Sequence, residues 1–523
     1  MNYADLFRAT LPETALEVAA LLVLVVDLSL LRKSSLKVRA AVAAVLGVAG
    51  CTAAIWAMWF TGTPGFAAGG SALLGAGGYI GAAQAGILVL TALTLLLLID
   101  SDFTTHVGEF VSVVLMSASG GLLIAGAQDL LVIFIGLELL SLGLYILTAF
   151  AKSSAKSAEA AMKYYLFGGM SAAFLLFGFS YLYGLSGTTS LAGVSWAIGQ
   201  AGSSPLVYVA WILIVAGLGF KVAAVPFHLW APDTYEGAPA PAAAFIASVS
   251  KVASFALLIT ICLNSLNFTS PMVGNRDLVA RLVTDFYGSA THLGSILLII
   301  AAASMIVGNL AALAQTSVRR LLAYSAIAHA GYILLGISTH ASIVGQTNLF
   351  GFMFTQFRAE VVSTNAVLFY VLTYGLTTIG AFGVVGVVER ATGSDKLDAF
   401  LGLHKRNPLL AGVLLILFLS LAGIPPLVGF WAKFNLFAAV LSVSAGPVPF
   451  GLVALAIALS AVSLYYYLQV LKRAYVMKAV DESSIRVHPV TLLVLVGIAA
   501  AVVVLGCFPA LLQNWISSFY LVN

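Results

Sequence analysis

Charged side chains are scarce in this sequence of 523 residues. Only 8% of the residues are charged, whereas 61% are hydrophobic. A soluble domain carries about 25% charged residues, so water is not the main solvent of this chain. Apolar runs of roughly 20 residues, which is long enough to cross a bilayer, recur along the whole sequence. The composition therefore excludes a soluble protein and indicates an integral membrane protein.

The apolar runs also lack the alternation of polar and apolar residues that the strands of a membrane β-barrel need. They are continuously apolar and rich in Leu, Ala and Val. Only helices and closed barrels satisfy every backbone group in lipid, so we predict an all-α fold, a polytopic helical bundle. The formal net charge of +4 is small and dispersed, and we expect no nucleic-acid partner.

Cysteine is almost absent, because Cys51, Cys262 and Cys507 are the only three and lie far apart. No CxxC pair and no cysteine quartet indicates a metal or iron–sulfur site. A secretory signal peptide is not indicated either, since Glu13 and Glu17 precede the first apolar run and the basic residues follow it. We expect a retained first helix whose amino end lies outside.

Fourteen segments are predicted to span the membrane, and we number them helix 1 to helix 14 in chain order. Helices 4 and 5 are separated only by a short turn at 127–129. The segments are 11–31, 38–60, 77–99, 109–128, 129–150, 163–184, 206–225, 239–262, 292–312, 321–339, 361–388, 409–438, 449–472 and 489–517. We divide the chain into an N-terminal three-helix region (1–108), a first repeat (109–262, helices 4–8), a second repeat (292–474, helices 9–13) and a C-terminal helix (489–523).

The basic residues support this topology. Seventeen of the 24 Lys and Arg residues fall in loops on one side, and four fall on the other side. Because short cytoplasmic loops are enriched in Lys and Arg, the richer side is predicted to be cytoplasmic and both termini periplasmic. The three remaining basic residues, Lys221, Lys251 and Lys433, lie inside apolar segments.

Helix breakers accompany two of these lysines. Pro226 follows Lys221 in helix 7, and Pro425 and Pro426 precede Lys433 in helix 12. Proline removes a backbone donor and clashes with the preceding turn, and in a membrane the freed carbonyls are tolerated only beside protein or cavity water. Broken helices at matching places in two halves are typical of transporters built from repeats. We therefore predict two inverted five-helix repeats with discontinuous helices 7 and 12.

Glu138 lies in the middle of helix 5, where a carboxylate costs several kcal/mol unless it is paired, hydrated or protonated. One interpretation is a neutral glutamic acid bonded to the backbone or to Ser141. The other is an ion pair, for which Lys221 is the natural partner. Burial disfavours the charged form of Lys221 and Lys251, whereas a nearby carboxylate favours it. Such an amine can exchange a proton when its partner moves, although Lys433 could instead reach the interface.

Two histidines are candidate members of the same path. His329 lies within helix 10, where a buried packing role and a proton-relay role are both open. His228 follows Pro226 near the predicted cytoplasmic surface, beside Asp233 and Glu236. For His228 a role in ordering the loop and a role in proton uptake are both open.

These motifs resemble a known family. The stretch from Gly217 to Pro241 resembles the helix 7–8 signature of the antiporter-like membrane subunits of complex I, and 319–329 resembles their helix 10 signature. The stretches 160–169 and 181–188 are more typical of the subunit N members. The resemblance covers about residues 110–475. Subunit M typically has glutamate at the position of Lys433, and subunit L carries a long additional lateral helix. The extra length of this chain over a minimal family member is expected to lie in two stretches, the glycine-rich segment 61–78 and the segment 264–290.

The resemblance implies the roles of the buried residues. It identifies Glu138 and Lys221 with the family's helix 5 and helix 7 pair, Lys251 with its helix 8 lysine, and Lys433 with the helix 12 lysine near the exit side. It implies a proton-translocating subunit of NADH:quinone oxidoreductase in the bacterial inner membrane, beside a subunit M-like and a subunit K-like neighbour. NADH, FMN, the iron–sulfur clusters and quinone would be bound by other subunits, so no cofactor is expected in this chain.

Two other functions remain open at this stage. The chain could belong to a multi-subunit monovalent cation/proton antiporter, whose helical core would look alike. It could also be a structural spacer that carries no protons. Unchanged proton pumping after neutralisation of the interior lysines would favour the spacer.

Overall fold

The structure is a computed structural model of the 523-residue chain. It describes residues 7–61, 73–201, 204–266, 276–338, 349–443, 446–479 and 483–521. Most of the glycine-rich 61–78 and a third of 264–290 lie outside these residues. The side chains of Arg276, Arg281 and Arg358, which the predicted topology uses, also lie outside the described part.

Helices make up almost all of the described chain. The first half contains α2 (Leu11–Val25), α3 (Leu36–Thr61), α4 (Gly78–Leu97), α5 (Val107–Gly126), α6 (Leu130–Thr148), α7 (Ala155–Ser186), α8 (Leu191–Ala201), α9 (Pro205–Val222), α10 (Trp230–Gly237) and α11 (Ala240–Leu266). The second half contains α12 (Arg276–Leu313), α13 (Val318–Ser338), α14 (Leu349–Thr392), α15 (Leu403–Arg406), α16 (Pro408–Ala422), α17 (Val428–Val443), α18 (Pro447–Tyr475), α19 (Pro489–Cys507) and α20 (Ala510–Leu521).

Every predicted spanning segment coincides with one helix or with two consecutive helices, which confirms the helical membrane bundle. Within the described ranges, twelve helices are long and apolar enough to cross a membrane, and α16 and α17 are shorter apolar helices. A five-residue π-helical turn, Val26–Leu30, continues α2. The predicted turn between helices 4 and 5 is confirmed, since α5 ends at Gly126 and α6 begins at Leu130.

The last predicted segment, 489–517, is not one helix. It divides into α19 and α20, because α19 ends at Cys507 and Pro509 follows. Proline cannot continue the hydrogen-bond ladder, and it disfavours helical conformation in the residue before it. The short helices α8 and α10, which the predicted segments do not include, are two further differences.

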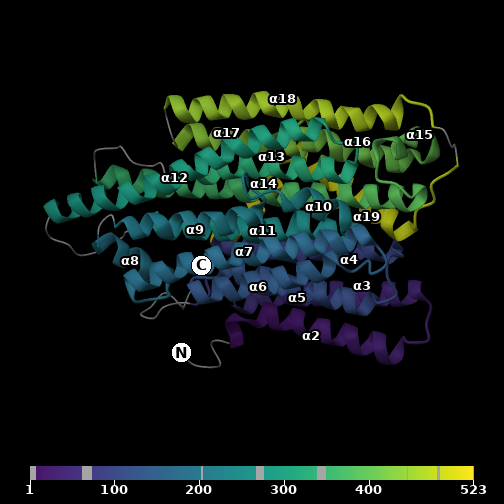
Figure 1. Ribbon diagram of the computed structural model, residues 1–523, viewed down its shortest axis with the longest axis horizontal. Helices are drawn as coiled ribbons and strands as arrows, with labels where there is room; N and C mark the ends of the chain where they lie inside the picture. Colours follow the sequence, from purple (N-terminus) through teal and green to yellow (C-terminus); the bar gives the residue numbers. More distant parts are fainter. Residues whose placement is uncertain are drawn as a thin grey trace.

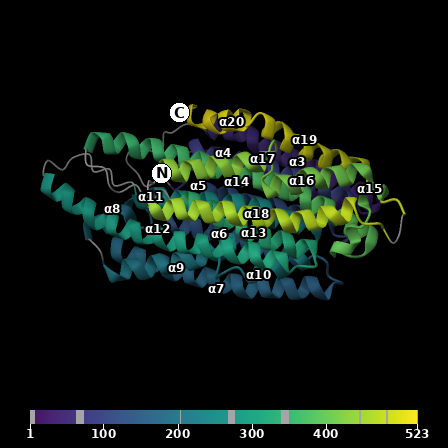
Figure 2. The same ribbon diagram turned by 90° about the horizontal axis from the view of Figure 1, so that it is seen from above.

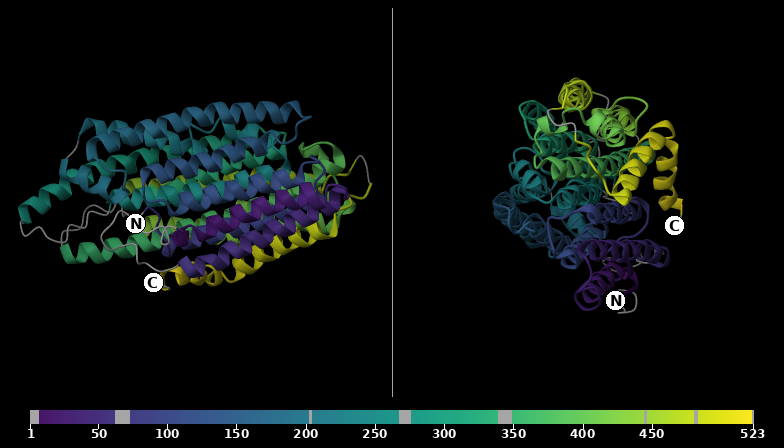
Figure 3. Two further views of the ribbon diagram at one scale, coloured as in Figure 1. Left: turned by 90° about the horizontal axis from the view of Figure 1, so that it is seen from below. Right: turned by 90° about the vertical axis from the view of Figure 1, so that its right-hand side faces the viewer.

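The helices run side by side along one direction, from α2 at one edge of the bundle to α18 at the other (Figure 1). The views along and across the bundle show α19 and α20 on the flank of this array, near α4 (Figures 2 and 3). The start of α2 and the end of α20 both lie away from α15, as the even number of predicted spans requires. The helix α12 has 38 residues and extends past its neighbours at that end of the bundle.

The centre of the bundle is occupied by α11 and α13. In both helices, 94% of the most apolar 18-residue stretch is buried, whereas the corresponding value is 22% in α18 at the edge of the bundle. The packing partners of α11 include α4, α5, α9 and α14. Since α11 carries Lys251 and α13 carries His329, two of the predicted polar residues lie in the most enclosed part of the molecule.

One end of the bundle gathers most of the ion pairs, and we call it the basic end. Its cations include Lys156, Lys163, Arg319, Arg320 and Arg390. These residues come from loops and helix ends that the topology predicts to share one side. Their ion pairs join different loops and helix ends, which confirms that these loops meet at one end of the bundle.

Candidate functional site: a file of buried lysines at two helix breaks

The first helix break follows α9. Its capping residue Ala223 adopts a left-handed conformation with φ of 58°, and the Ala224 amide donates to the Gly219 carbonyl at 2.8 Å. A left-handed conformation costs a residue with a Cβ roughly 1–2 kcal/mol. Pro226 then prevents α9 from continuing, and the chain resumes a helix only at Trp230 in α10. The predicted discontinuity of helix 7 is confirmed, one residue after Val222.

The second break lies between α16 and α17. Gly423 has φ of 89°, which favours glycine, and the Gly423 amide donates to Ser420 and Leu419 carbonyls. The helix resumes at Val428 after Pro425 and Pro426. The predicted discontinuity of helix 12 is confirmed as well.

Each break leaves helix carbonyls without an intrahelical partner, and in each case a lysine amine supplies the bond. The Nζ atom of Lys251 in α11 donates to the Val222 carbonyl at 2.5 Å. The Nζ atom of Lys433 in α17 donates to the Leu421 and Ala422 carbonyls at 3.1 and 2.9 Å. An ammonium group at a helix C-terminus is favoured by the helix dipole. Lys251 and Lys433 therefore cap the two breaks.

Serine hydroxyls complete both breaks. The Val225 amide, just past the first break, donates to Ser304 Oγ of α12 at 2.9 Å. At the second break, Gly429 donates to Ser420 Oγ at 3.2 Å, and Lys433 donates to Ser460 Oγ at 2.8 Å. The two breaks thus share a left-handed cap, a proline, a lysine on the freed carbonyls and a serine on a freed amide. This correspondence is what two related repeats would produce.

Lys221 lies in the last turn of α9 and is buried. Its Nζ atom donates to Ser141 Oγ of α6 at 2.6 Å. Ser141 is three residues after Glu138, so the two side chains share one face of α6. Among the described residues, the Glu138 carboxylate makes no hydrogen bond and no ion pair within 4 Å. The Glu138 charge still acts electrostatically on Lys221 over a longer distance, so the pairing of these two residues stays a prediction.

His329 is buried in α13 among tyrosines. Its Nδ1 atom lies 2.7 Å from Tyr370 Oη of α14. The Tyr332 ring lies edge-on to His329, with 5.8 Å between ring centroids, and the Lys433 amine lies 5.6 Å from the centroid of the same Tyr332 ring. Tyr332 therefore links His329 to Lys433. Likewise, Lys251 lies 5.6 Å from the Trp230 ring.

The file of residues has two connected halves. In one half, Lys221 and the carbonyl partner of Lys251 are neighbours in the chain at the end of α9. In the other half, His329 and Lys433 meet at Tyr332. The helix α11, which carries Lys251, packs against α13 and α14, so the halves adjoin along these helices.

His228 lies between the first break and α10 and is half-buried. Its Nδ1 atom has no partner among the described residues. The expected acidic neighbours are engaged elsewhere. Asp233 pairs with Lys163 at 2.7 Å and with Arg320 at 2.6 Å, and Glu236 pairs with Lys156 and Arg320.

The Asp233 carboxyl belongs to the surface of the basic end. Burial by itself would raise its pKa, but hydrogen bonds and ion pairs with Lys163 and Arg320 outweigh burial and hold the pKa below its usual range. The ion-pair network fixes α10 to α7 and α13, and with α10 the first helix break.

A comparison with known proteins identifies the family. A family model described as NADH:quinone oxidoreductase/Mrp antiporter, TM, matches residues 127–291, 269–350 and 342–460. The chain is 46% identical over 529 residues to NADH-quinone oxidoreductase subunit N 2 of Acidobacterium capsulatum, and the match covers 99% of both chains. The chain belongs to the subunit N family of NADH-quinone oxidoreductases.

Solved structures agree with this membership of the subunit N family. A chain of respiratory complex I from Thermus thermophilus is 30% identical, with a TM-score of 0.73, and the match covers 96% of this chain and 98% of that chain. A chain of the Mrp complex from a Dietzia species also has a TM-score of 0.73, at 19% identity, covering 97% of this chain and 51% of that one. The second likeness shows a shared fold alone.

Some residues at the two helix breaks of this subunit N homologue were not predicted from the sequence. Ser304 and Ser460 are unremarkable serines in apolar helices, and Tyr332 and Tyr370 read as core aromatics. Their roles depend on which helices meet at the breaks. The prolines beside Lys221 and Lys433 were the available signal, since freed carbonyls in a membrane need donors from neighbouring helices.

Proposed function

We propose that this chain is a proton-translocating membrane-arm subunit of an NADH:quinone oxidoreductase. One observation carries the proposal. The amines of Lys251 and Lys433 lie on the carbonyls freed by two helix breaks in the middle of a membrane bundle. Buried ionisable groups within spanning helices are costly and mark ion or proton pathways. Membership of the subunit N family assigns this pathway to an NADH:quinone oxidoreductase.

The relay we propose begins at Glu138 and Lys221. Among the described residues, the Lys221 amine has one hydrogen bond, to Ser141, whereas the Lys433 amine has three. A group with a single partner gains or loses its proton more easily when the surroundings shift. Movement of Glu138 toward or away from Lys221 would change the stability of the Lys221 ammonium, since a nearby carboxylate favours the charged form.

The proton then passes to Lys251 and onward to Lys433. The Val222 carbonyl, next to Lys221, brings the first break into contact with Lys251. His329 and Tyr332 connect the central region to Lys433, which is the proposed exit residue. His228 is proposed as an uptake residue near the basic end.

The enzyme activity belongs to the whole complex, and this subunit contributes translocation without redox chemistry. NADH, FMN, the iron–sulfur clusters and quinone are proposed to be bound by other subunits. Subunit M-like and subunit K-like proteins are the proposed neighbours in the membrane. We place the protein in the bacterial inner membrane with the basic end in the cytoplasm and both termini in the periplasm, following the bias of Lys and Arg toward cytoplasmic loops.

The repeat assignment is also proposed. Residues 109–262 and 292–474 would form the two five-helix units, with 1–108 and 489–523 outside them. Support comes from the matching chemistry of the two breaks, one in each unit.

The test is to measure protons pumped per electron in the assembled complex after Glu138→Gln or Lys221→Ala. We expect both variants to lower this ratio while NADH oxidation by the peripheral part continues. Lys152→Ala, at an exposed lysine of the basic end, is the matched control. A wild-type ratio in both variants, with full assembly, would rule out the relay.

A cation/proton antiporter subunit is the second candidate, favoured by the shared fold with the Mrp chain and by the description of the family model, which names both kinds of protein. Copurification from native membrane separates the two, because the bound partners are either redox subunits or antiporter subunits. A spacer role predicts that neutralising Lys221, Lys251 and Lys433 leaves pumping unchanged.

A further inference from the structure

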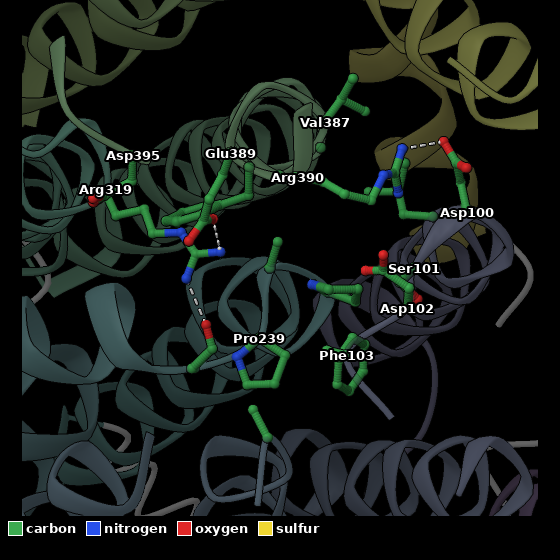
Figure 4. Close-up of a pocket in the computed structure, with 18 of the residues that line it drawn as sticks. Asp100, Ser101, Asp102, Phe103, Pro239, Arg319, Val387, Glu389, Arg390 and Asp395 are labelled. Carbon is green, nitrogen blue, oxygen red and sulfur yellow. Dashed lines mark hydrogen bonds and ion pairs between the residues drawn. The ribbon is translucent and has the colours of Figure 1, made fainter. Parts of the chain in front are cut away.

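A cavity of about 330 Å³ opens at the basic end of the bundle. Two ion pairs lie on opposite sides of it, Arg319 with Glu389 and Arg390 with Asp100, each at 2.5 Å (Figure 4). Glu389 and Arg390 are consecutive residues of α14 and reach in opposite directions. The cavity therefore has a charged rim, and none of these rim residues belongs to the lysine file.

Polar atoms in the cavity wall lack protein partners. Arg319 Nε and Thr491 Oγ1 have no hydrogen bond within the described part of the chain. Both side chains are nearly enclosed, with exposed fractions of 4% and 2%. Buried polar atoms of this kind bond to ordered water, and one water needs only about 10–15 Å³. The cavity has room for several waters and donors to hold them.

Aromatic residues connect the cavity wall to the region of His329 beside α14. Phe382 lines the cavity and packs edge-on against Tyr235, with 5.6 Å between ring centroids. Tyr374 lies eight residues earlier on the same face, about two turns deeper in the bundle. The Tyr374 ring is 4.8 Å from His329. This face of α14 thus joins the cavity to the buried histidine.

Two hydroxyl groups, one on α10 and one on α14, are available for bonding in this region. The Oη atoms of Tyr235 and Tyr374 are buried and have no partner among the residues described. A tyrosine hydroxyl can donate one hydrogen bond and accept another. Buried hydroxyls without protein partners require water. The two tyrosines can therefore carry a water-linked chain of hydrogen bonds through the wall between the cavity and His329.

We propose that this cavity is a proton-intake vestibule, and that Glu389, Tyr235 and Tyr374 lead protons from it to His329. The inference rests on the proposed proton-translocating function and names its uptake route. Each hydroxyl accepts a proton from its cavity side and releases its own toward His329, so no group is consumed. The route supplies the second half of the bundle directly and bypasses His228.

The first experiment uses the assembled complex in inside-out membrane vesicles. We expect Tyr235→Phe and Tyr374→Phe each to slow proton transfer through this subunit about fivefold, the effect of losing one hydrogen-bonded connection. Glu389→Gln should slow it in the same direction. Tyr79→Phe is the matched control, because the Tyr79 hydroxyl bonds to Thr260, outside the route.

The second experiment modifies the cavity after assembly, so misfolding cannot explain the result. Ala240 lines the cavity and is half-buried. An Ala240→Cys variant in a Cys507→Ser background, which removes the exposed native thiol, is treated with a membrane-impermeant cationic thiosulfonate. Labelling from the basic-end side should block pumping, and labelling of right-side-out vesicles should not.

The outcomes separate this inference from the proposed function. If Lys221→Ala lowers pumping but the tyrosine variants and the labelled Ala240→Cys variant pump normally, the vestibule is wrong and the relay stands. If Lys221→Ala also pumps normally, the proposed function falls with it. Loss of pumping on labelling, together with slow transfer in both tyrosine variants, supports the vestibule. Slow transfer after His228→Ala alone would place uptake at the first break instead.

Discussion

Lys433 has two roles in this structure, and one pair of substitutions separates them. Its amine caps the end of α16 through the Leu421 and Ala422 carbonyls and also bonds to Ser460. In the proposed relay the same amine releases a proton. Lys433→Met keeps the length and removes both roles, whereas Lys433→Arg keeps the donors and the charge. Arginine is not deprotonated in proteins, so only the relay is removed by Lys433→Arg.

The magnitude follows from the three bonds. A hydrogen bond from a charged donor is worth roughly 1.5–3 kcal/mol, and an acceptor left unpaired in the interior costs about 1–3 kcal/mol. Removal of the buried ammonium offsets part of this loss of stability, because the free-energy cost of desolvating the ammonium also disappears. We expect Lys433→Met to weaken the break by roughly 2–5 kcal/mol.

The assay has two readouts on the assembled complex. Thermal dissociation of this subunit reports on the helix break, and protons pumped per electron report on the relay. Lys433→Met should dissociate at a lower temperature and fail to pump. Lys433→Arg should dissociate close to the wild-type temperature and still fail to pump. A wild-type pumping ratio in Lys433→Arg would refute proton release by Lys433, and an unchanged dissociation temperature in Lys433→Met would refute the capping role.

Three further predictions concern single contacts. Ser141→Ala removes the hydrogen bond from the Lys221 amine to Ser141, and we expect about a tenfold slower proton transfer through this subunit, measured as pumping in vesicles. Gly423→Ala should lower the temperature of subunit dissociation, because the left-handed conformation costs about 1–2 kcal/mol with a Cβ, while Gly412→Ala in open helical space should not lower it. Asp233 has a lowered folded-state pKa, so its stabilisation is complete above its unfolded value of about 3.9 and is lost as the pH falls through the folded value. Asp233→Asn should therefore lower the temperature of subunit dissociation at neutral pH. In acid, the dissociation temperatures of the variant and the wild type should become equal.

The composition determined the class of the protein without any structure. Long apolar runs and few charges leave only a helical bundle in lipid, and the runs located all the main helices. The count of basic residues isolated Lys221, Lys251 and Lys433 because a lysine that no loop can hold must lie within the bundle. Prolines beside two of them located the helix breaks to within a few residues. These inferences succeed because they depend on local chemistry and on the solvent.

Tertiary structure decided which atoms the lysines contact. Nothing in the sequence around Lys251 shows that its amine lies on the Val222 carbonyl, since α11 and α9 meet only through packing. Likewise, the Lys221 amine donates to Ser141 of α6, a contact that the residues around Lys221 do not predict. The cavity at the basic end depends on the ends of α11, α14 and α19, which are far apart in the chain. Residue types fix which groups need partners, whereas the packing of distant helices decides which partners they find.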